Sequence, residues 1–141
     1  MVAQTYVDAV GAVRAWINGR TATLVGLGHP LQKGAHFKRL DGAADATYAR
    51  LSEGISVRGA GAENPDMDAS LLAEVYGGTR EEATAAAVAL AEELSTGLSG
   101  TAASVPGAVL FVVDDITGPL WAPDGDLPRL TLTFTVRVRP A

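Results

Sequence analysis

The sequence predicts an α+β domain in which a mostly antiparallel β-sheet packs against two helices. Two segments, about residues 5–18 and 80–96, carry apolar residues at the three- and four-residue spacing of a helix. The C-terminal segment 129–139 alternates strictly between apolar and polar residues, which is typical of a long strand with one buried face. The chain has 141 residues and neither a linker nor an internal repeat, so we expect one domain over residues 1–141.

The first expected element is the helix over about residues 5–18. Its apolar face contains four residues at helical spacing, namely Tyr6, Val10, Val13 and Ile17. Thr5 can cap the start of this helix, and Asp8 has the position of the acid in a capping box. The Asn18–Gly19 pair is a typical stop signal, so we expect the helix to end there.

The next part of the chain has only weak patterns. Residues 21–25 and 55–58 have the composition of short strands, and residues 35–40 alternate weakly with Phe37 on the inward side. Several glycines and a proline break longer regular structure between these segments. Residues 59–68 lack an apolar pattern, so we expect them to form a loop or the tip of a hairpin.

A strand, a turn and the second helix follow. Apolar residues alternate along residues 70–76, and the Gly77–Gly78 pair turns the chain. Thr79 and Glu82 then have the T-x-x-E spacing of a capping box, which marks the start of the helix over about residues 80–96. One face of this helix is rich in alanine, so the helix can lie close against a sheet.

The last third of the chain is expected to be β-structure. Residues 107–113 are apolar on both faces, which indicates a central strand. Two prolines break the pattern over residues 117–127, and Asp124–Gly125 is a turn signal. The final strand, 129–139, has a firmly set register because a slip of one residue would expose its whole apolar face.

Composition excludes several functional classes. The chain has no cysteine, so it forms neither a disulfide framework nor a thiolate zinc site. Its formal net charge of −5 argues against binding nucleic acid through a basic face. The first residues lack the basic segment of a signal peptide, and no run approaches the roughly 18–20 apolar residues of a membrane span. We therefore expect no association with a membrane.

Few residues are candidates for catalysis or for binding a metal ion. His29 and His36 are the only histidines, and a proline and a glycine interrupt any helix that would align them. Asp114 and Asp115 follow an expected apolar strand. Adjacent strand residues point to opposite faces, so the two carboxylates should not share an ion unless the strand has already ended. The acidic run 64–68 lacks the glycine and the distal glutamate of a calcium loop. We therefore expect no catalytic, metal-binding or cofactor-binding residues, and no enzyme.

Surface groups suited to contacts between subunits are more prominent. One basic cluster lies between residues 33 and 39, and a basic strip follows the polar side of the last strand, including Arg129. Trp16 and Trp121 are either core residues or interface anchors. The residues expected at contacts between subunits or between rings are Lys33, His36, Lys38, Arg39, Glu63, Asp66, Asp68, Trp121, Arg137 and Arg139.

Two segments carry a resemblance to a known family. Residues 72–83 read Leu-Ala-Glu-Val-Tyr-Gly-Gly-Thr-Arg-Glu-Glu-Ala, a strand that closes on Tyr-Gly before a T-R-E-E-A helix start. Residues 116–140 contain a G-P-x-W-x-P-D turn that leads into a long terminal strand. In the order and spacing of these motifs the chain resembles the tail terminator proteins of long-tailed double-stranded DNA phages. The resemblance covers most of the chain and is weakest over residues 21–68.

The resemblance implies a structural virion protein without catalytic activity. Tail terminators form a hexameric ring that caps the head-proximal end of the tail tube, ends tube polymerisation and joins the tail to the neck. The implied partners are five further copies of the chain, the tail tube protein and a head–tail stopper or neck protein, with only weak contact to passing DNA. The implied location is the tail–neck junction of the virion, after assembly in the host cytoplasm.

Two other interpretations stay open. Another neck component, such as a head–tail stopper or a head completion protein, also assembles as a ring, but the capped helix over residues 80–96 disfavours the small β-barrel typical of stoppers. A small ligand-binding or hydrolytic α+β domain is the third interpretation, and a ligand bound to the purified protein would favour it. For the ring, we expect residues 59–68 and 33–39 to reach neighbouring subunits or rings.

Overall fold

The computed structural model describes residues 7–26, 34–39, 47–58, 66–98 and 102–140, which form two helices and one six-stranded sheet. The elements in chain order are α1 (Ala9–Gly26), β1 (Ala35–His36), β2 (Tyr48–Arg58), β3 (Met67–Tyr76), α2 (Arg80–Gly97), β4 (Ala103–Val105), β5 (Ala108–Trp121) and β6 (Arg129–Pro140). The predicted α+β class, with a mostly antiparallel sheet, two helices and a long C-terminal strand, is confirmed.

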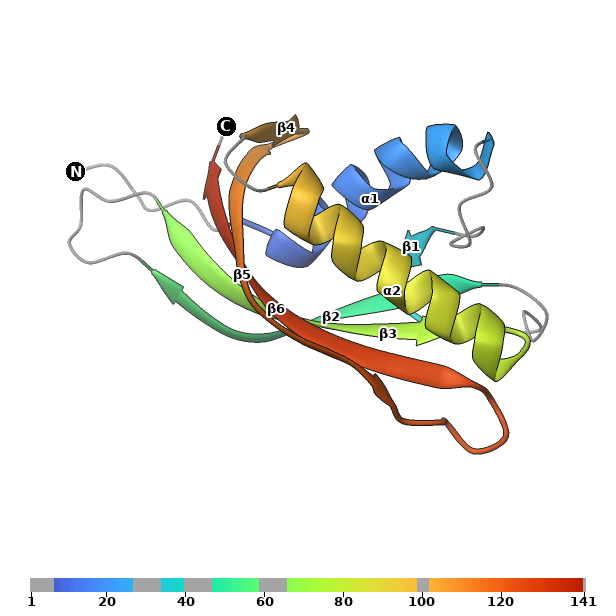
Figure 1. The fold of residues 1–141 in the computed structure, drawn as a ribbon. Coiled ribbons are helices and arrows are strands. Elements are labelled where there is room, and N and C mark those ends of the chain that lie inside the picture. Colours follow the sequence, from blue (N-terminus) through green and yellow to red (C-terminus); the bar gives the residue numbers. More distant parts are fainter. Residues whose placement is uncertain (1–6, 27–33, 40–46, 59–65, 99–101, 141) are drawn as a thin grey trace, which may run out of the picture.

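The sheet has the strand order β1-β2-β3-β6-β5-β4, and the short pairing of β1 with β2 is parallel. Its long strands curve together, and both helices lie on the inner side of the curve (Figure 1). Residues 107–113, expected to form a central strand, belong to the first part of β5, which lies between β6 and β4 over residues 108–110 and next to the β3–β6 pair at the middle of the sheet. The second apolar face of β5 is covered by arginine, since the Arg139 guanidinium lies 5.1 Å from the centroid of the Phe111 ring.

The two faces of the sheet have different side chains, and we name them the covered face and the open face. The covered face packs against α1 and α2 and includes every second residue of β6, namely Leu130, Leu132, Phe134, Val136 and Val138, all buried. The open face carries the residues between them, from Thr131 to Arg139. The strict alternation predicted for the last strand is therefore confirmed.

Helix α1 is shifted and lengthened relative to the prediction. Asp8 is its cap, because the carboxylate Oδ1 accepts a hydrogen bond from the backbone N–H of Gly11 at 3.0 Å. Thr5, the expected cap, lies outside the described residues. The helix does not stop at Asn18–Gly19 but continues to Gly26, so the short strand expected over residues 21–25 is wrong. A glycine inside a helix costs about 1 kcal/mol relative to alanine, which the packing of a long helix can offset.

Helix α2 follows its predicted bounds and cap. The Thr79 hydroxyl accepts a hydrogen bond from the backbone N–H of Glu82 at 3.1 Å. The preceding turn needs glycine, because a Cβ atom on Gly77 would lie 2.6 Å from the backbone nitrogen of Ala83. At the other end, a Cβ atom on Gly97 would lie 2.6 Å from the Trp16 ring. Trp16 is therefore a buried core residue where the two helices meet, rather than an interface anchor.

β2 and β5 continue, with shifts of register, through segments where the sequence pattern predicts an interruption. The short strand expected over residues 55–58 is the second part of β2, which shifts register between Glu53 and Ser56. The loop expected over residues 59–68 ends earlier, since β3 begins at Met67, and residues 59–65 lie outside the described part. β5 runs through residues 117–121 with further register shifts. The Asp124–Gly125 turn is confirmed by reciprocal backbone hydrogen bonds between Asp124 and Leu127, of 3.0 and 2.9 Å.

No helix in the described part of the chain has the length and apolar character needed to cross a membrane.

Candidate functional site

The open face of the sheet carries two polar clusters at its two ends. The hairpin cluster lies near the turn between β5 and β6 and consists of Arg39, Arg50, Glu74, Tyr76, Asp124 and Arg129. The bulge cluster lies where β5 leaves its regular register and consists of Asp66, Asp68, Asp114, Asp115, Thr135, Arg137 and Arg139. Alternation along β2, β3 and β6 points the members of both clusters on these strands away from the helices, and the others lie beside them at strand ends or at the β5 bulge.

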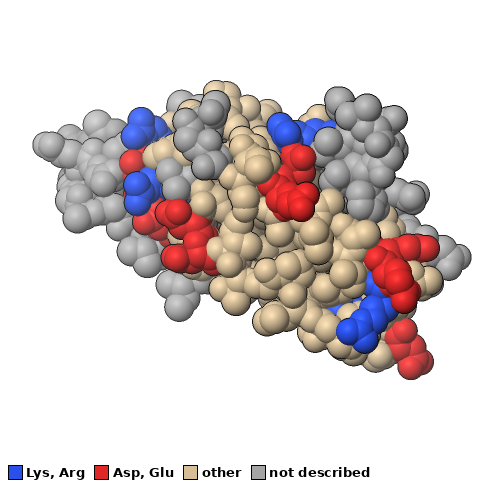
Figure 2. All heavy atoms as spheres, in the orientation of Figure 1, with Lys and Arg blue, Asp and Glu red and all other residues tan. Residues whose placement is uncertain are grey.

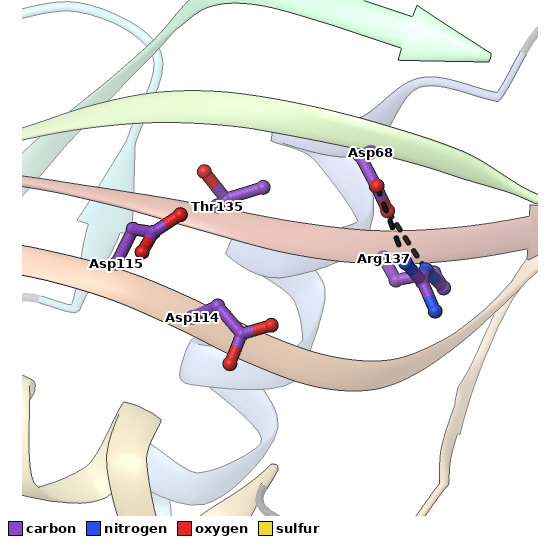
Figure 3. Close-up of a pocket in the computed structure, with 5 residues that line it drawn as sticks. All are labelled: Asp68, Asp114, Asp115, Thr135 and Arg137. Atoms are coloured by element: carbon purple, nitrogen blue, oxygen red, sulfur yellow. Dashed lines mark hydrogen bonds and ion pairs between the residues drawn. The ribbon is translucent and has the colours of Figure 1, made fainter. Parts of the chain in front are cut away.

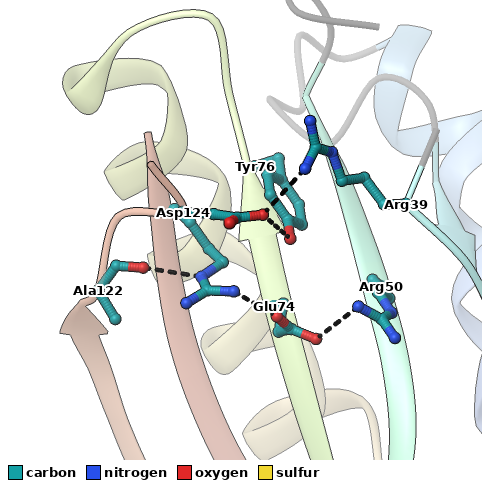
Figure 4. Close-up of polar contacts among 7 residues, drawn as sticks. Arg39, Arg50, Glu74, Tyr76, Ala122 and Asp124 are labelled. Atoms are coloured by element: carbon teal, nitrogen blue, oxygen red, sulfur yellow. Dashed lines mark hydrogen bonds and ion pairs between the residues drawn. The ribbon is translucent and has the colours of Figure 1, made fainter. Parts of the chain in front are cut away.

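Glu74 is the centre of the hairpin cluster. It is 8% exposed although it lies on the open face. Its carboxylate lies 2.6 Å from one guanidinium nitrogen of Arg129 and 3.5 Å from one of Arg50, on the strands to either side (Figure 4). Arg129 also donates a hydrogen bond from Nε to the carbonyl oxygen of Ala122 at 2.7 Å. The buried carboxylate is therefore paired on both sides, as a charge away from water requires.

Asp124 ties the tip of the β5–β6 hairpin to the rest of the cluster. Its carboxylate accepts a hydrogen bond from the Tyr76 hydroxyl at 3.1 Å and another from Arg39 at 3.3 Å. Burial raises the pKa of Tyr76 above its usual value, and the neighbouring carboxylates act in the same direction. Tyr76 stacks on Tyr48 at 5.0 Å between ring centroids, and His36 meets Tyr48 edge-on at 6.0 Å. This arrangement holds the hairpin in place and leaves its polar groups engaged with one another.

Two ion pairs cross between β3 and β6 in the bulge cluster. Arg137 donates two hydrogen bonds to the carboxylate of Asp68, at 2.8 and 3.3 Å (Figure 3). Arg139 donates one hydrogen bond to Asp66 at 2.8 Å, and this bond holds the pKa of Asp66 below its usual value. Since Asp68 and Arg137 are Cα partners in the β3–β6 register, the pairing follows from the alternation of both strands.

Asp114 and Asp115 line one pocket together with Asp68, Thr135 and Arg137. The expectation that their side chains point to opposite faces is therefore wrong. The register of β5 shifts between Asp114 and Thr117, and Asp115 has a φ angle of 53°, which turns its side chain toward the same side (Figure 3). Neither carboxylate has a hydrogen bond or an ion pair with another described residue. No group of three His, Asp or Glu residues in the described part is arranged to hold a metal ion.

The remaining predicted contact residues lie at three places. His36 is in β1, and Lys38 and Arg39 follow it as exposed residues. Trp121 ends β5, is 40% exposed and lies under the Arg80 guanidinium, 4.5 Å from the ring centroid. Lys33 and Glu63 lie outside the described residues, as does His29, a candidate only for catalysis or metal binding. The structure thus brings Asp66, Asp68, Arg137 and Arg139 together and places the basic segment at another edge of the sheet.

The sequence did not single out Glu74, Arg50 and Tyr76. Glu74 stood out only as a charged residue in a short alternating strand, and its partner Arg129 is 55 residues away in the sequence. The signal that relates them is the β3–β6 register, which pairs Glu74 with Thr131 and Tyr76 with Arg129. A single sequence does not show which strands pair, so it does not reveal that these residues are neighbours.

The face that carries α2 has a different character. Figure 2 shows charged side chains at both ends of this face and in its upper middle, with largely uncharged surface between them. Val88, in the middle of α2, is 42% exposed. Acidic residues lie in the first turn of the helix, at Glu81 and Glu82, where the positive end of the helix dipole favours them.

No protein-family model and no curated protein sequence matches this chain significantly.

Proposed function

We propose that this chain is a tail terminator of a long-tailed phage, a structural subunit that closes into a ring on the head-proximal end of the tail tube. The ring ends tube polymerisation and offers a surface to the neck. The proposal begins from the motif order described above, and it assigns the protein a role in assembly rather than in catalysis.

The observation that carries the proposal is the way in which the two motif segments fit together. The first segment forms the end of β3, a glycine turn and the capped start of α2, and the second forms the end of β5, a hairpin and β6. Tyr76 and Arg129, which belong to different segments, are Cα partners in the β3–β6 ladder. The backbone N–H of Gly77 also donates to the carbonyl oxygen of Pro128 at 3.3 Å. The two segments that carry the family resemblance are therefore neighbours in the structure.

The polar clusters also support a role in assembly. In the hairpin cluster the charged groups pair with one another, as in a structural network, and the arrangement contains no nucleophile beside a free base. In the bulge cluster the two arginines already bind carboxylates. The large exposed apolar side chains of the described part, by contrast, are those suited to contacts with other proteins.

The test is electron microscopy of particles assembled without this protein. We expect abnormally long tails, of normal width, that stay detached from heads. Complementation with the intact chain should restore tails of uniform length joined to heads. Normal, joined tails in the absence of the protein would refute the proposal, and heads that lose their DNA beside normal free tails would favour a stopper or head completion protein.

A further inference from the structure

We infer that copies of this chain associate head to tail, the free edge of β5 in one copy meeting the β1 edge of the next. This inference deepens the proposed function and depends on it only for the closure of the copies into a ring. The occupant of each edge is therefore a second copy of the same chain.

The β5 edge is partly apolar and, with the carboxylates of Asp114 and Asp115 set against the exposed Arg80 guanidinium over Trp121, is net acidic among its described residues. β4 pairs only with residues 108–110 of β5, so the rest of β5 is an outer strand of the described sheet. Along it lie the exposed carboxylates of Asp114 and Asp115. Farther along the same strand, Leu120 is 56% exposed and Trp121 is 40% exposed. Exposed aromatic and aliphatic groups beside charges are typical of the centre and rim of a protein interface.

The β1 edge is basic and carries an exposed aromatic ring. Phe37 is 44% exposed, and the guanidinium of Arg14 from α1 lies 4.2 Å above its ring centroid. Lys38 is exposed beside it. Arg39 is half exposed but already bound to Asp124 of its own chain, so among the described residues Arg14 and Lys38 are the cations at this edge that are not held in an ion pair.

Neither edge presents a regular row of backbone groups for strand addition. At β1, the Asn18 side-chain amide bonds both backbone groups of Ala35, donating to its carbonyl oxygen at 3.0 Å and accepting from its N–H at 2.8 Å. β5 shifts register three times between Leu110 and Leu120. Bulges and occupied backbone groups are devices that prevent two sheets from pairing edge to edge. Contacts between copies must then come from side chains.

Charge decides between the two ways of pairing the edges. A symmetric pair of β5 edges would bring together two net acidic surfaces, and a symmetric pair of β1 edges would bring together two basic surfaces. Like charges across an interface cost several kcal/mol, whereas the β5 edge and the β1 edge have opposite signs. Because the two edges lie on opposite sides of the sheet, each copy retains one unused edge after pairing, and repeated addition generates a ring or a filament.

The natural absence of cysteine allows a direct test by cross-linking. A chain carrying both Asp115→Cys and Lys38→Cys, treated with a short bismaleimide, should give a ladder of covalent oligomers. A mixture of the two single-cysteine chains should give covalent dimers and nothing larger, and each single variant alone should stay monomeric. The matched control combines Lys38→Cys with Thr133→Cys, which is exposed in the middle of the open face and should not yield a ladder.

Charge reversal gives the second arm of the test. Asp114→Lys with Asp115→Lys should reduce cross-linking between Leu120→Cys and Phe37→Cys at least about tenfold, since a loss of 1.4 kcal/mol corresponds to one factor of ten. Lys38→Glu should also reduce cross-linking. Combining Lys38→Glu with Asp114→Lys and Asp115→Lys should restore the ladder of covalent oligomers. All three charged residues are exposed, but Asp115 has a φ angle of 53°, which lysine adopts less readily than aspartate, so circular dichroism checks that each variant is folded.

The inference is overturned if the Asp115–Lys38 pair gives no more ladder than the Thr133 control, or if the Asp115→Cys chain links to itself. A failure of this inference can be distinguished from a failure of the proposed function. A ladder in solution together with normal tails in particles lacking the protein would keep the interface and reject the tail role. Abnormally long, detached tails without edge cross-links would keep the tail role and reject this interface.

Discussion

The two faces of the sheet stabilise the same strands by different physical means. On the covered face, β6 buries residues such as Phe134 and Leu132, each 1% exposed, on the side that packs against α2. On the open face, the neighbouring residues of the same strands hold one another by ion pairs, such as Arg137 with Asp68. Burial of apolar area is worth about 25 cal/mol per Å², whereas exposed ion pairs contribute between zero and about 1 kcal/mol. The covered face thus determines stability, and the open face is free to vary with function.

The hairpin cluster differs from the rest of the open face, because its central charge is buried. Glu74 lies on the open face and is nearly as buried as the core. Its pairing should therefore matter more than that of the exposed ion pairs in the bulge cluster. The following predictions test this order of effects.

The largest effect is expected from a truncation on the covered face. Phe134→Ala should lower the free energy of unfolding by about 3–5 kcal/mol, because it removes a fully buried ring and leaves a cavity. Urea denaturation followed by circular dichroism measures this. The adjacent open-face substitution Thr133→Ala should change the value by less than about 0.5 kcal/mol. Similar losses at the two positions would contradict the division between faces.

A smaller effect is expected from the buried carboxylate of the hairpin cluster. Glu74→Gln keeps the shape but removes the charge between Arg129 and Arg50, and it should cost about 1–2 kcal/mol. The two arginine side chains are 23% and 40% exposed, so water partly replaces the lost partner. The same denaturation experiment on Glu92→Gln, an exposed residue of α2, provides the control and should show almost no change.

The hydroxyl of Tyr76 should contribute less again. Tyr76→Phe removes its hydrogen bond to Asp124 and should cost about 0.5–1.5 kcal/mol. Tyr48→Phe is a suitable comparison, because Tyr48 is the stacking partner of Tyr76. A loss confined to Tyr48→Phe would show that the hydroxyl of Tyr48, and not the bond from Tyr76 to the hairpin, stabilises this end of the sheet.

Alkaline pH should reveal the contribution of the Tyr76 hydroxyl to stability. Burial raises the pKa of Tyr76 above the unfolded value near 10.0, so the folded state keeps its proton to a higher pH than the unfolded state does. The resulting contribution to stability is complete below pH 10 and is lost as the pH rises through the folded-state pKa. Thermal melts of the native chain should therefore fall above pH 10 more steeply than those of Tyr76→Phe. Parallel curves would contradict this.

The smallest effect is expected in the bulge cluster. The hydrogen bond from Arg139 lowers the pKa of Asp66, so this pair stabilises the fold above the unfolded value of 3.8 and is lost as the pH falls through the folded-state pKa. Asp66→Asn should change neutral-pH stability little and should make acid unfolding less steep. Added salt should weaken the native pair but leave the variant unaffected. An effect as large as that of Glu74→Gln would remove the distinction between the two clusters.

Local signals in the sequence were sufficient for several elements. The capping box at Thr79 and Glu82 places the start of α2, because both partners of the hydrogen bond lie within one turn. The alternation from Leu130 to Val138 identifies β6 and its buried face, because every second residue points the same way. The hairpin turn at Asp124–Gly125 is similarly local.

The errors have a common cause in contacts between distant parts of the chain. The local sequence at Asn18 predicts the end of a helix. The Asn18 side-chain amide instead hydrogen-bonds the backbone of Ala35, 17 residues later, and α1 continues past it. Asp114 and Asp115 share a pocket because β5 bulges against β6. Both outcomes depend on pairing and docking that no short window of sequence contains.

The bond between Asp124 and Arg39 has a mechanical consequence. A hairpin that projects from a sheet can be peeled open from its tip, one pair of hydrogen bonds at a time. Here the tip is fastened through Asp124 to Tyr76 on β3 and to Arg39 beyond β1. A pull on the tip is therefore shared with strands at the far side of the sheet and acts as shear across several ladders at once. Such a fastening suits a projection that must resist tension without unzipping.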